Sequence, residues 1–245
     1  MAMTPISRSL DLALVLLLAA LATVLIAWKW KEPYLLGALL VPIIVPLVLR
    51  LGAREGIVLA GTGALLGPLT EIACVGGGLW RYSETGGLPF IPSWLFAIWA
   101  CFLPAMILIL RGTLGRIPVG RPADLPLALA GLVGEVLFFI ALGRNATLTL
   151  AVSLCILAVA LARGTAETIV MIAAGGLLGP ACEALPVASG AWSYMVQDFM
   201  GMPAWLPVAY AFFAVLLAKA GLAVSMIALA GQKPPSTKAQ ARDRA

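Results

Sequence analysis

The chain has 245 residues, of which 62% are hydrophobic and 11% are charged, and its formal net charge is +5. Soluble proteins average about half hydrophobic and about a quarter charged residues, so this composition excludes an ordinary soluble domain and predicts an integral membrane protein. Most of the positive charge lies between apolar runs, where it orients membrane proteins, and it gives no indication of nucleic-acid binding.

Eight apolar segments are each long enough to cross a bilayer as a helix, which takes roughly 18 or more residues. We therefore predict an all-α polytopic membrane protein with about eight transmembrane helices. In chain order the segments begin near Leu10, Tyr34, Gly56, Leu88, Leu125, Ala146, Glu167 and Ala204.

The distribution of basic residues predicts how the helices are oriented. Cytoplasmic loops of membrane proteins carry an excess of lysine and arginine. Eleven basic residues fall at the two termini and in the loops on the N-terminal side, whereas four fall in the opposite loops. We expect both termini in the cytoplasm and the protein in the inner membrane of a bacterium.

One segment of the sequence occurs twice, 112 residues apart. Of the 28 positions from 55 to 82, 13 carry the same residue as their counterparts from 167 to 194. Both copies contain Gly-Pro-x-x-Glu, and in both a Trp-x-Tyr begins nine residues after the glutamate. Such repetition at a fixed offset indicates two copies of one structural unit.

Each copy belongs to one half of the chain, roughly 1–116 and 117–230, with four predicted helices per half. The polar residues 231–245 form a tail that we expect to be disordered. Because each half has an even number of helices, both halves enter the membrane from the same side. The four-helix repeats are thus predicted to be parallel, with a symmetry axis along the membrane normal.

The third and seventh predicted helices carry the repeated glutamates, Glu71 and Glu183. A Gly-x-x-x-Gly spacing precedes each of them and lets a neighbouring helix come close. Trp80 lies nine residues beyond Glu71, about 13 Å along a helix. The carboxyl groups are therefore expected deep in the membrane, with the aromatic rings nearer its outer face.

Glu71 and Glu183 are the candidate catalytic residues. A carboxyl group inside a membrane is costly and is usually functional. Its functional interpretation is a proton donor or an ion ligand, since a buried carboxylic acid suits general acid catalysis. The alternative is a structural carboxyl that hydrogen-bonds a neighbouring helix, but two copies in matched positions favour function.

Aromatic residues near both glutamates are the candidate substrate-binding residues. Their faces could stabilise a carbocation by cation–π attraction. Aromatic side chains also gather at membrane interfaces for their amphipathic character alone, so this alternative stays open. The candidates are Trp80, Tyr82, Trp94, Trp99, Trp192, Tyr194 and Trp205.

Three charged residues without a counterpart in the other half are candidates for tuning the site. Glu135 and Lys219 fall within predicted helices, and we expect them to neutralise each other. Alternatively, Lys219 pairs with a substrate group or acts on Glu183. Arg81, between the repeated tryptophan and tyrosine, is expected to extend to the interface.

The sequence contains no histidine, and its four cysteines show no paired spacing. The absence of histidine excludes histidine-ligated haem, ordinary zinc and copper sites and a serine–histidine triad. We therefore expect neither a metal nor another cofactor.

Short motifs surround both glutamates. They are Glu71, Gly-Leu-Trp-Arg-Tyr at 78–82 and Gly-Leu-Pro at 87–89, and then Glu183, Gly-Ala-Trp-Ser-Tyr at 190–194 and Gly-Met-Pro at 201–203. The set resembles the membrane carotenoid-biosynthesis family that includes the carotenoid 1,2-hydratases of bacteria and the bisanhydrobacterioruberin hydratases of archaea. The resemblance covers roughly residues 55–105 and 167–215.

The resemblance implies a cofactor-independent hydratase or cyclase, of the lyase or isomerase class, that acts by acid catalysis on a double bond of a carotenoid or another isoprenoid. Two alternatives remain from the residues alone. One is a proton-coupled transporter of a small or lipophilic molecule, and the other is a non-catalytic scaffold that binds lipid or pigment. The expected partners are a lipophilic isoprenoid and the bilayer, and the sequence predicts no oligomeric state.

Overall fold

The computed structural model describes residues 4–230, and within this range it contains eight helices that are long and apolar enough to cross a membrane. The predicted all-α membrane fold is thus confirmed, whereas the predicted tail at 231–245 lies outside the described residues. The elements are α1 (Pro5–Lys29), α2 (Pro33–Leu51), α3 (Ala53–Gly76), β1 (Trp80–Tyr82), α4 (Leu95–Leu114), α5 (Asp124–Leu142), α6 (Ala146–Arg163), α7 (Ala166–Ala188), β2 (Trp192–Tyr194) and α8 (Leu206–Leu229).

Most helices begin within a few residues of their predicted starts, and α4 differs most. It begins at Leu95 instead of near Leu88. The segment before it contains Pro89 and Pro92, which lack an amide donor, and Phe90 has a positive φ of 70°. These residues hold the chain in a loop that delivers Trp94 to the start of the helix.

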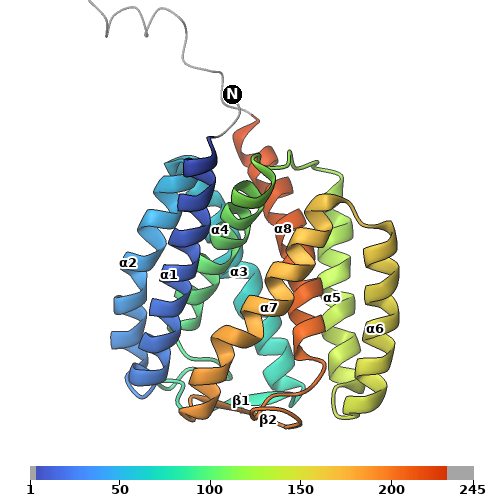
Figure 1. The fold of residues 1–245 in the computed structure, drawn as a ribbon. Coiled ribbons are helices and arrows are strands. Elements are labelled where there is room, and N and C mark those ends of the chain that lie inside the picture. The colour runs from blue at the N-terminus through green and yellow to red at the C-terminus, as the bar shows by residue number, and fades with distance from the viewer. Residues whose placement is uncertain (1–3, 231–245) are drawn as a thin grey trace, which may run out of the picture.

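The two strands show how the repeats are related. They pair antiparallel, with Trp80 opposite Tyr194, Arg81 opposite Ser193 and Tyr82 opposite Trp192. Because Trp80 and Trp192 are equivalent by the offset of 112, a half-turn through the middle pair exchanges the two strands. The strands lie at one end of the bundle, and the N-terminus and the end of α8 lie at the other (Figure 1).

The repeated glycines place the helices of each repeat in close contact. A Cβ at Gly67 would lie 2.1 Å from the ring of Trp99, and a Cβ at Gly179 would lie 2.2 Å from the ring of Tyr210. Only glycine leaves room for these rings, so α3 packs closely on α4 and α7 packs in the same way on α8. Both α3 and α7 continue as helices through their internal prolines, Pro68 and Pro180.

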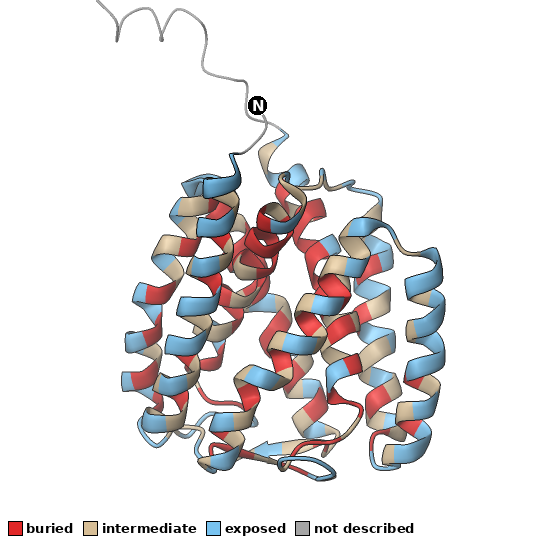
Figure 2. Ribbon diagram, in the orientation of Figure 1, coloured by how far each residue is buried: buried red, intermediate tan, exposed pale blue. Residues whose placement is uncertain are grey.

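The centre of the bundle is formed by α4 and α8. In the most apolar stretch of α4, 67% of residues are buried inside the protein, against 11% for α6. Figure 2 shows buried residues on the faces toward the centre and exposed residues over α6 and the outer faces of α1 and α2. The outer faces are apolar, as contact with lipid requires.

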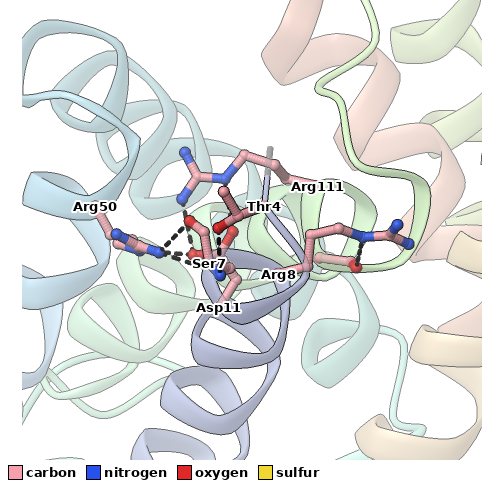
Figure 3. A network of polar contacts seen from close by, with 7 residues as sticks. Thr4, Ser7, Arg8, Asp11, Arg50 and Arg111 are labelled. Atoms are coloured by element: carbon pink, nitrogen blue, oxygen red, sulfur yellow. Dashed lines mark hydrogen bonds and ion pairs between the residues drawn. The ribbon is translucent and has the colours of Figure 1, made fainter. Parts of the chain in front are cut away.

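A buried ion cluster joins α1, α2 and α4 (Figure 3), close to the start of α1, which lies at the end opposite the strands (Figure 1). Asp11 is fully buried, and the Arg50 Nε lies 2.6 Å from its Oδ1. Arg111 donates to both carboxylate oxygens of Asp11, at 2.7 Å and 2.9 Å. Arg50 also donates to the hydroxyl of Ser7, at 2.8 Å. This carboxylate therefore fixes three helices of the first repeat.

Replacing Asp11 should destabilise the fold markedly. In Asp11→Asn the two arginines lose their counter-charge, and breaking a buried ion pair costs about 3 kcal/mol or more. Thermal unfolding in detergent, followed by circular dichroism, measures the effect. Asp124→Asn is the control, because Asp124 pairs with the exposed Arg121 in the same turn. Equal stability of the two variants would contradict the structural role of Asp11.

Candidate functional site

Glu71 is held by the aromatic residues that follow it in the sequence. Its Oε2 accepts hydrogen bonds from the Trp80 Nε1 at 3.1 Å and the Tyr82 hydroxyl at 2.9 Å. The side chain is buried. Both of these bonds end on Oε2, and the Trp99 indole also interacts with this carboxyl, without a hydrogen bond of regular geometry from its Nε1.

Glu183 repeats this arrangement and adds a third donor. Its Oε2 accepts from the Trp192 Nε1 at 3.3 Å and from the Tyr194 hydroxyl. Its Oε1 accepts from the Tyr210 hydroxyl on α8. Both oxygens of Glu183 therefore accept hydrogen bonds from side chains.

The local fold explains why the motif has this spacing. After α3 ends, Gly78 adopts a φ of 76° and turns the chain back beneath the helix, and Gly190 does so after α7 with a φ of 83°. Residues two apart in a strand point to the same side. Trp80 and Tyr82 thus both face Glu71.

Pairing of the strands brings the two aromatic sets into contact. The ring centroids of Trp80 and Tyr194 are 5.6 Å apart, and those of Tyr82 and Trp192 are 5.8 Å apart.

Desolvation by burial raises the pKa of Tyr82 and of Tyr194 well above the usual phenol value. The phenols therefore stay protonated and act as hydrogen-bond donors to the glutamates.

The first cavity, of about 150 Å³, lies among α1, α2, α4 and α7. The carboxyl groups of Glu71 and Glu183 border it, and its other walls are mainly aliphatic and aromatic. Four predicted aromatic residues line it, namely Tyr82, Trp94, Trp99 and Trp192.

The second cavity, of about 80 Å³, lies among α3, α5 and α8. It is bordered by the same two glutamates and by Glu135 of α5. The half-turn that exchanges the repeats also exchanges the two cavities, since Tyr82 and Trp94 of the first correspond to Tyr194 and Trp205 of the second. Its predicted aromatic residues are Trp80, Trp99, Tyr194 and Trp205.

The structure thus brings together both candidate glutamates and all seven candidate aromatic residues around two adjoining cavities. Sequence reasoning missed Tyr210, which occupies in α8 the place of Trp99 in α4. The offset between these two positions is 111, because the loop before α8 is one residue shorter than its counterpart. The glycine that contacts each ring, Gly67 or Gly179, was the available signal.

The three charged residues that were candidates for tuning the site, Glu135, Lys219 and Arg81, do not lie together in the structure. The expected neutralisation of Glu135 by Lys219 is wrong, since Lys219 is exposed and lines a separate hollow with Asp124. Glu135 instead borders the second cavity. Arg81 lies on the strand ribbon, where its Nε is 3.3 Å from the Ser193 hydroxyl. Of these three residues, only Glu135 borders one of the two cavities.

Two tryptophans in the first cavity have unsatisfied polar groups. The Nε1 atoms of Trp94 and Trp99 are buried and have no hydrogen-bond partner within residues 4–230. A buried donor without an acceptor costs about 1–3 kcal/mol. These groups are the natural contacts for an oxygen atom of a ligand. In the same range, no group of three histidine, cysteine or acidic side chains is arranged to hold a metal ion.

The two glutamates should respond differently to amide substitution. In Glu71→Gln the amide oxygen can accept both donors, so we expect a loss below about 1 kcal/mol. In Glu183→Gln the amide nitrogen replaces one acceptor and leaves a buried phenol unsatisfied, which costs about 1–3 kcal/mol. Thermal unfolding of both variants in the same detergent measures the difference. A larger loss for Glu71→Gln would contradict this hydrogen-bond geometry.

Comparison with known proteins shows a relation of fold. No family model and no curated protein matches the chain. The Insig homologue MvINS from Mycobacterium vanbaalenii has a similar solved structure, with 21% identity and a TM-score of 0.52, and a cross-linked MvINS variant trimer has 20% identity and a TM-score of 0.55. Each comparison covers 74% of this chain and 96% of the other. The chain is therefore a membrane protein with an Insig-like fold.

The resemblance to carotenoid hydratases is wrong. The similar solved structures come from an Insig homologue, and no family model supports a hydratase. The motifs that suggested it have a structural basis in this chain, because glycine turns the chain and the Trp-x-Tyr pair binds the glutamate. Short motifs of this kind report a local fold and not a reaction.

Proposed function

We propose that this protein binds a membrane lipid in the first cavity without converting it. The observation that carries the proposal is a largely apolar cavity inside a membrane protein, bordered at one end by unsatisfied hydrogen-bonding groups. Binding cavities for small molecules commonly combine apolar walls with a few polar groups that fix orientation. The Insig-like fold supports a lipid-binding membrane protein over a carotenoid hydratase.

The lining predicts the chemistry of the lipid. Side chains of α1, such as Val15, Leu18 and Ala22, offer an apolar wall. Trp94 and Trp99 offer indole donors, and Glu71 offers its Oε1, to which neither Trp80 nor Tyr82 donates. A hydroxyl group both accepts and donates a hydrogen bond. A lipid alcohol satisfies these groups together, whereas a hydrocarbon satisfies none.

Farnesol and the hydrocarbon farnesene provide a matched pair of probes for this site. We expect farnesol to bind the purified protein saturably and at least tenfold more tightly than farnesene. Trp99→Phe should weaken farnesol binding about fivefold, as expected for one lost hydrogen bond of about 1 kcal/mol. Quenching of tryptophan fluorescence by a titration in nanodiscs measures both effects.

Leu137→Ala, on the lipid-facing side of α5, is the control and should leave farnesol binding unchanged. Equal affinity for the two probes would contradict the proposal. Acid-catalysed change of an isoprenoid double bond is a second candidate, favoured by the buried carboxyl of Glu71 among aromatic rings in the cavity wall. Chromatography of the same samples decides between them: a new product that disappears in Glu71→Gln indicates catalysis, and unchanged farnesol indicates binding alone.

We also infer that both termini face the cytoplasm. The basic ion cluster and the N-terminus lie at the end opposite the strands, in agreement with the charge bias of the loops. In a cysteine-free background, Glu84→Cys should react with a membrane-impermeant maleimide in intact cells. Thr113→Cys should react only after lysis. Labelling in the reverse order would contradict this orientation.

A further inference from the structure

The wall of the second cavity contains a third carboxyl group, that of Glu135 in α5, which the first cavity lacks. Buried positions in α1 and α5 follow the same spacing, with Val15 and Ile26 in α1 matching Ala128 and Phe139 in α5. On this alignment Glu135 stands where the first repeat has Ala22. A carboxyl group thus borders the second cavity at a place where the first is apolar.

The carboxyl of Glu135 hydrogen-bonds the backbone of Phe213, but one of its oxygens lacks a partner among the described residues. Its Oε2 is buried and makes no hydrogen bond to any residue of the described chain. No lysine or arginine lines this cavity. An unpaired charge in a low-dielectric interior is costly, so the carboxylate requires a positive group or a proton.

The neighbouring groups define what could pair with Glu135. Glu71 borders the same cavity, and its Oε1 is free of the hydrogen bonds that hold Oε2. Faces of aromatic residues form most of the remaining wall, and such faces attract cations. The aromatic residues are Trp80, Trp99, Phe139, Tyr194, Trp205, Tyr210 and Phe213.

We propose that the second cavity binds an organic ammonium group through Glu135 and Glu71. An ammonium group has three N–H donors, enough for the unpaired Oε2 of Glu135 and for Oε1 of Glu71, and its charge offsets negative charge on the carboxyl groups. A hydroxyl group has one donor and no charge. A metal ion is disfavoured because the described residues contain no cluster suited to one. The small volume selects a primary ammonium group on a short apolar chain.

Hexylamine and hexanol test the proposal on the unaltered protein. At pH 7 the amine is protonated, and both probes have the same alkyl chain. In nanodiscs of phosphatidylcholine, which has no primary amine, we expect hexylamine to bind saturably and at least tenfold more tightly than hexanol. Calorimetric titration measures both. Equal binding of the two probes, or no saturable binding of the amine, would overturn the proposal.

Two substitutions locate the bound amine. Glu135→Gln keeps the shape of the side chain and should weaken hexylamine binding at least tenfold, whereas Leu137→Ala on the outer face of the same helix should not. An unchanged affinity in Glu135→Gln would overturn the assignment to this cavity. Because Glu135 does not border the first cavity, Glu135→Gln should retain farnesol binding. An unchanged thermal unfolding temperature in detergent shows that the variant is folded, so the amine proposal can fail while farnesol binding persists, and the reverse.

Discussion

The structure depends on buried carboxyl groups that are held by neutral hydrogen-bond donors. Each repeat places a glutamate near the end of a transmembrane helix and returns a tryptophan and a tyrosine to it from the following strand. This requirement fixes the glycine turn, the position of the strand and, through the pairing of β1 with β2, the contact between the repeats. The two cavities lie beside these carboxyl groups because the strands close one end of the bundle.

Departures from the symmetry give the two cavities different chemistry. Tyr210 takes the place of Trp99, so Oε1 of Glu183 accepts a hydrogen bond from a phenol, whereas Glu71 has an indole beside it that makes no hydrogen bond of regular geometry. Glu135 takes the place of Ala22, so one cavity gains a carboxyl group and the other stays apolar at that wall. A duplicated unit can in this way keep one shared framework and present an oxygen-binding site on one side and a cation-binding site on the other.

The repeat made the fold and much of the site predictable from the sequence. A constant offset identified Glu71 and Glu183, and apolar length identified the helices. Tyr210 was not identified from the sequence, because the offset between the two repeats changes by one residue in the loop before α8. Insertions and deletions are tolerated in loops. The pairing of Asp11 with Arg50 and Arg111 was not predicted, because these residues lie far apart in the sequence. Only the packing of their helices brings the charges together. The short motifs around the two glutamates suggested a reaction, whereas in the structure they form a turn and its hydrogen bonds.

The two ends of the bundle bury acidic residues in contrasting ways. Asp11 is enclosed by two arginines, which neutralise it and join it to two neighbouring helices. The glutamates beside the strands receive hydrogen bonds from indoles and phenols, which are donors that bring no positive charge. Such carboxyl groups still require a proton or an external positive group, and cavities lie directly beside them. Ligand exchange is therefore expected at the strand end, because the ion cluster at the opposite end is already complete.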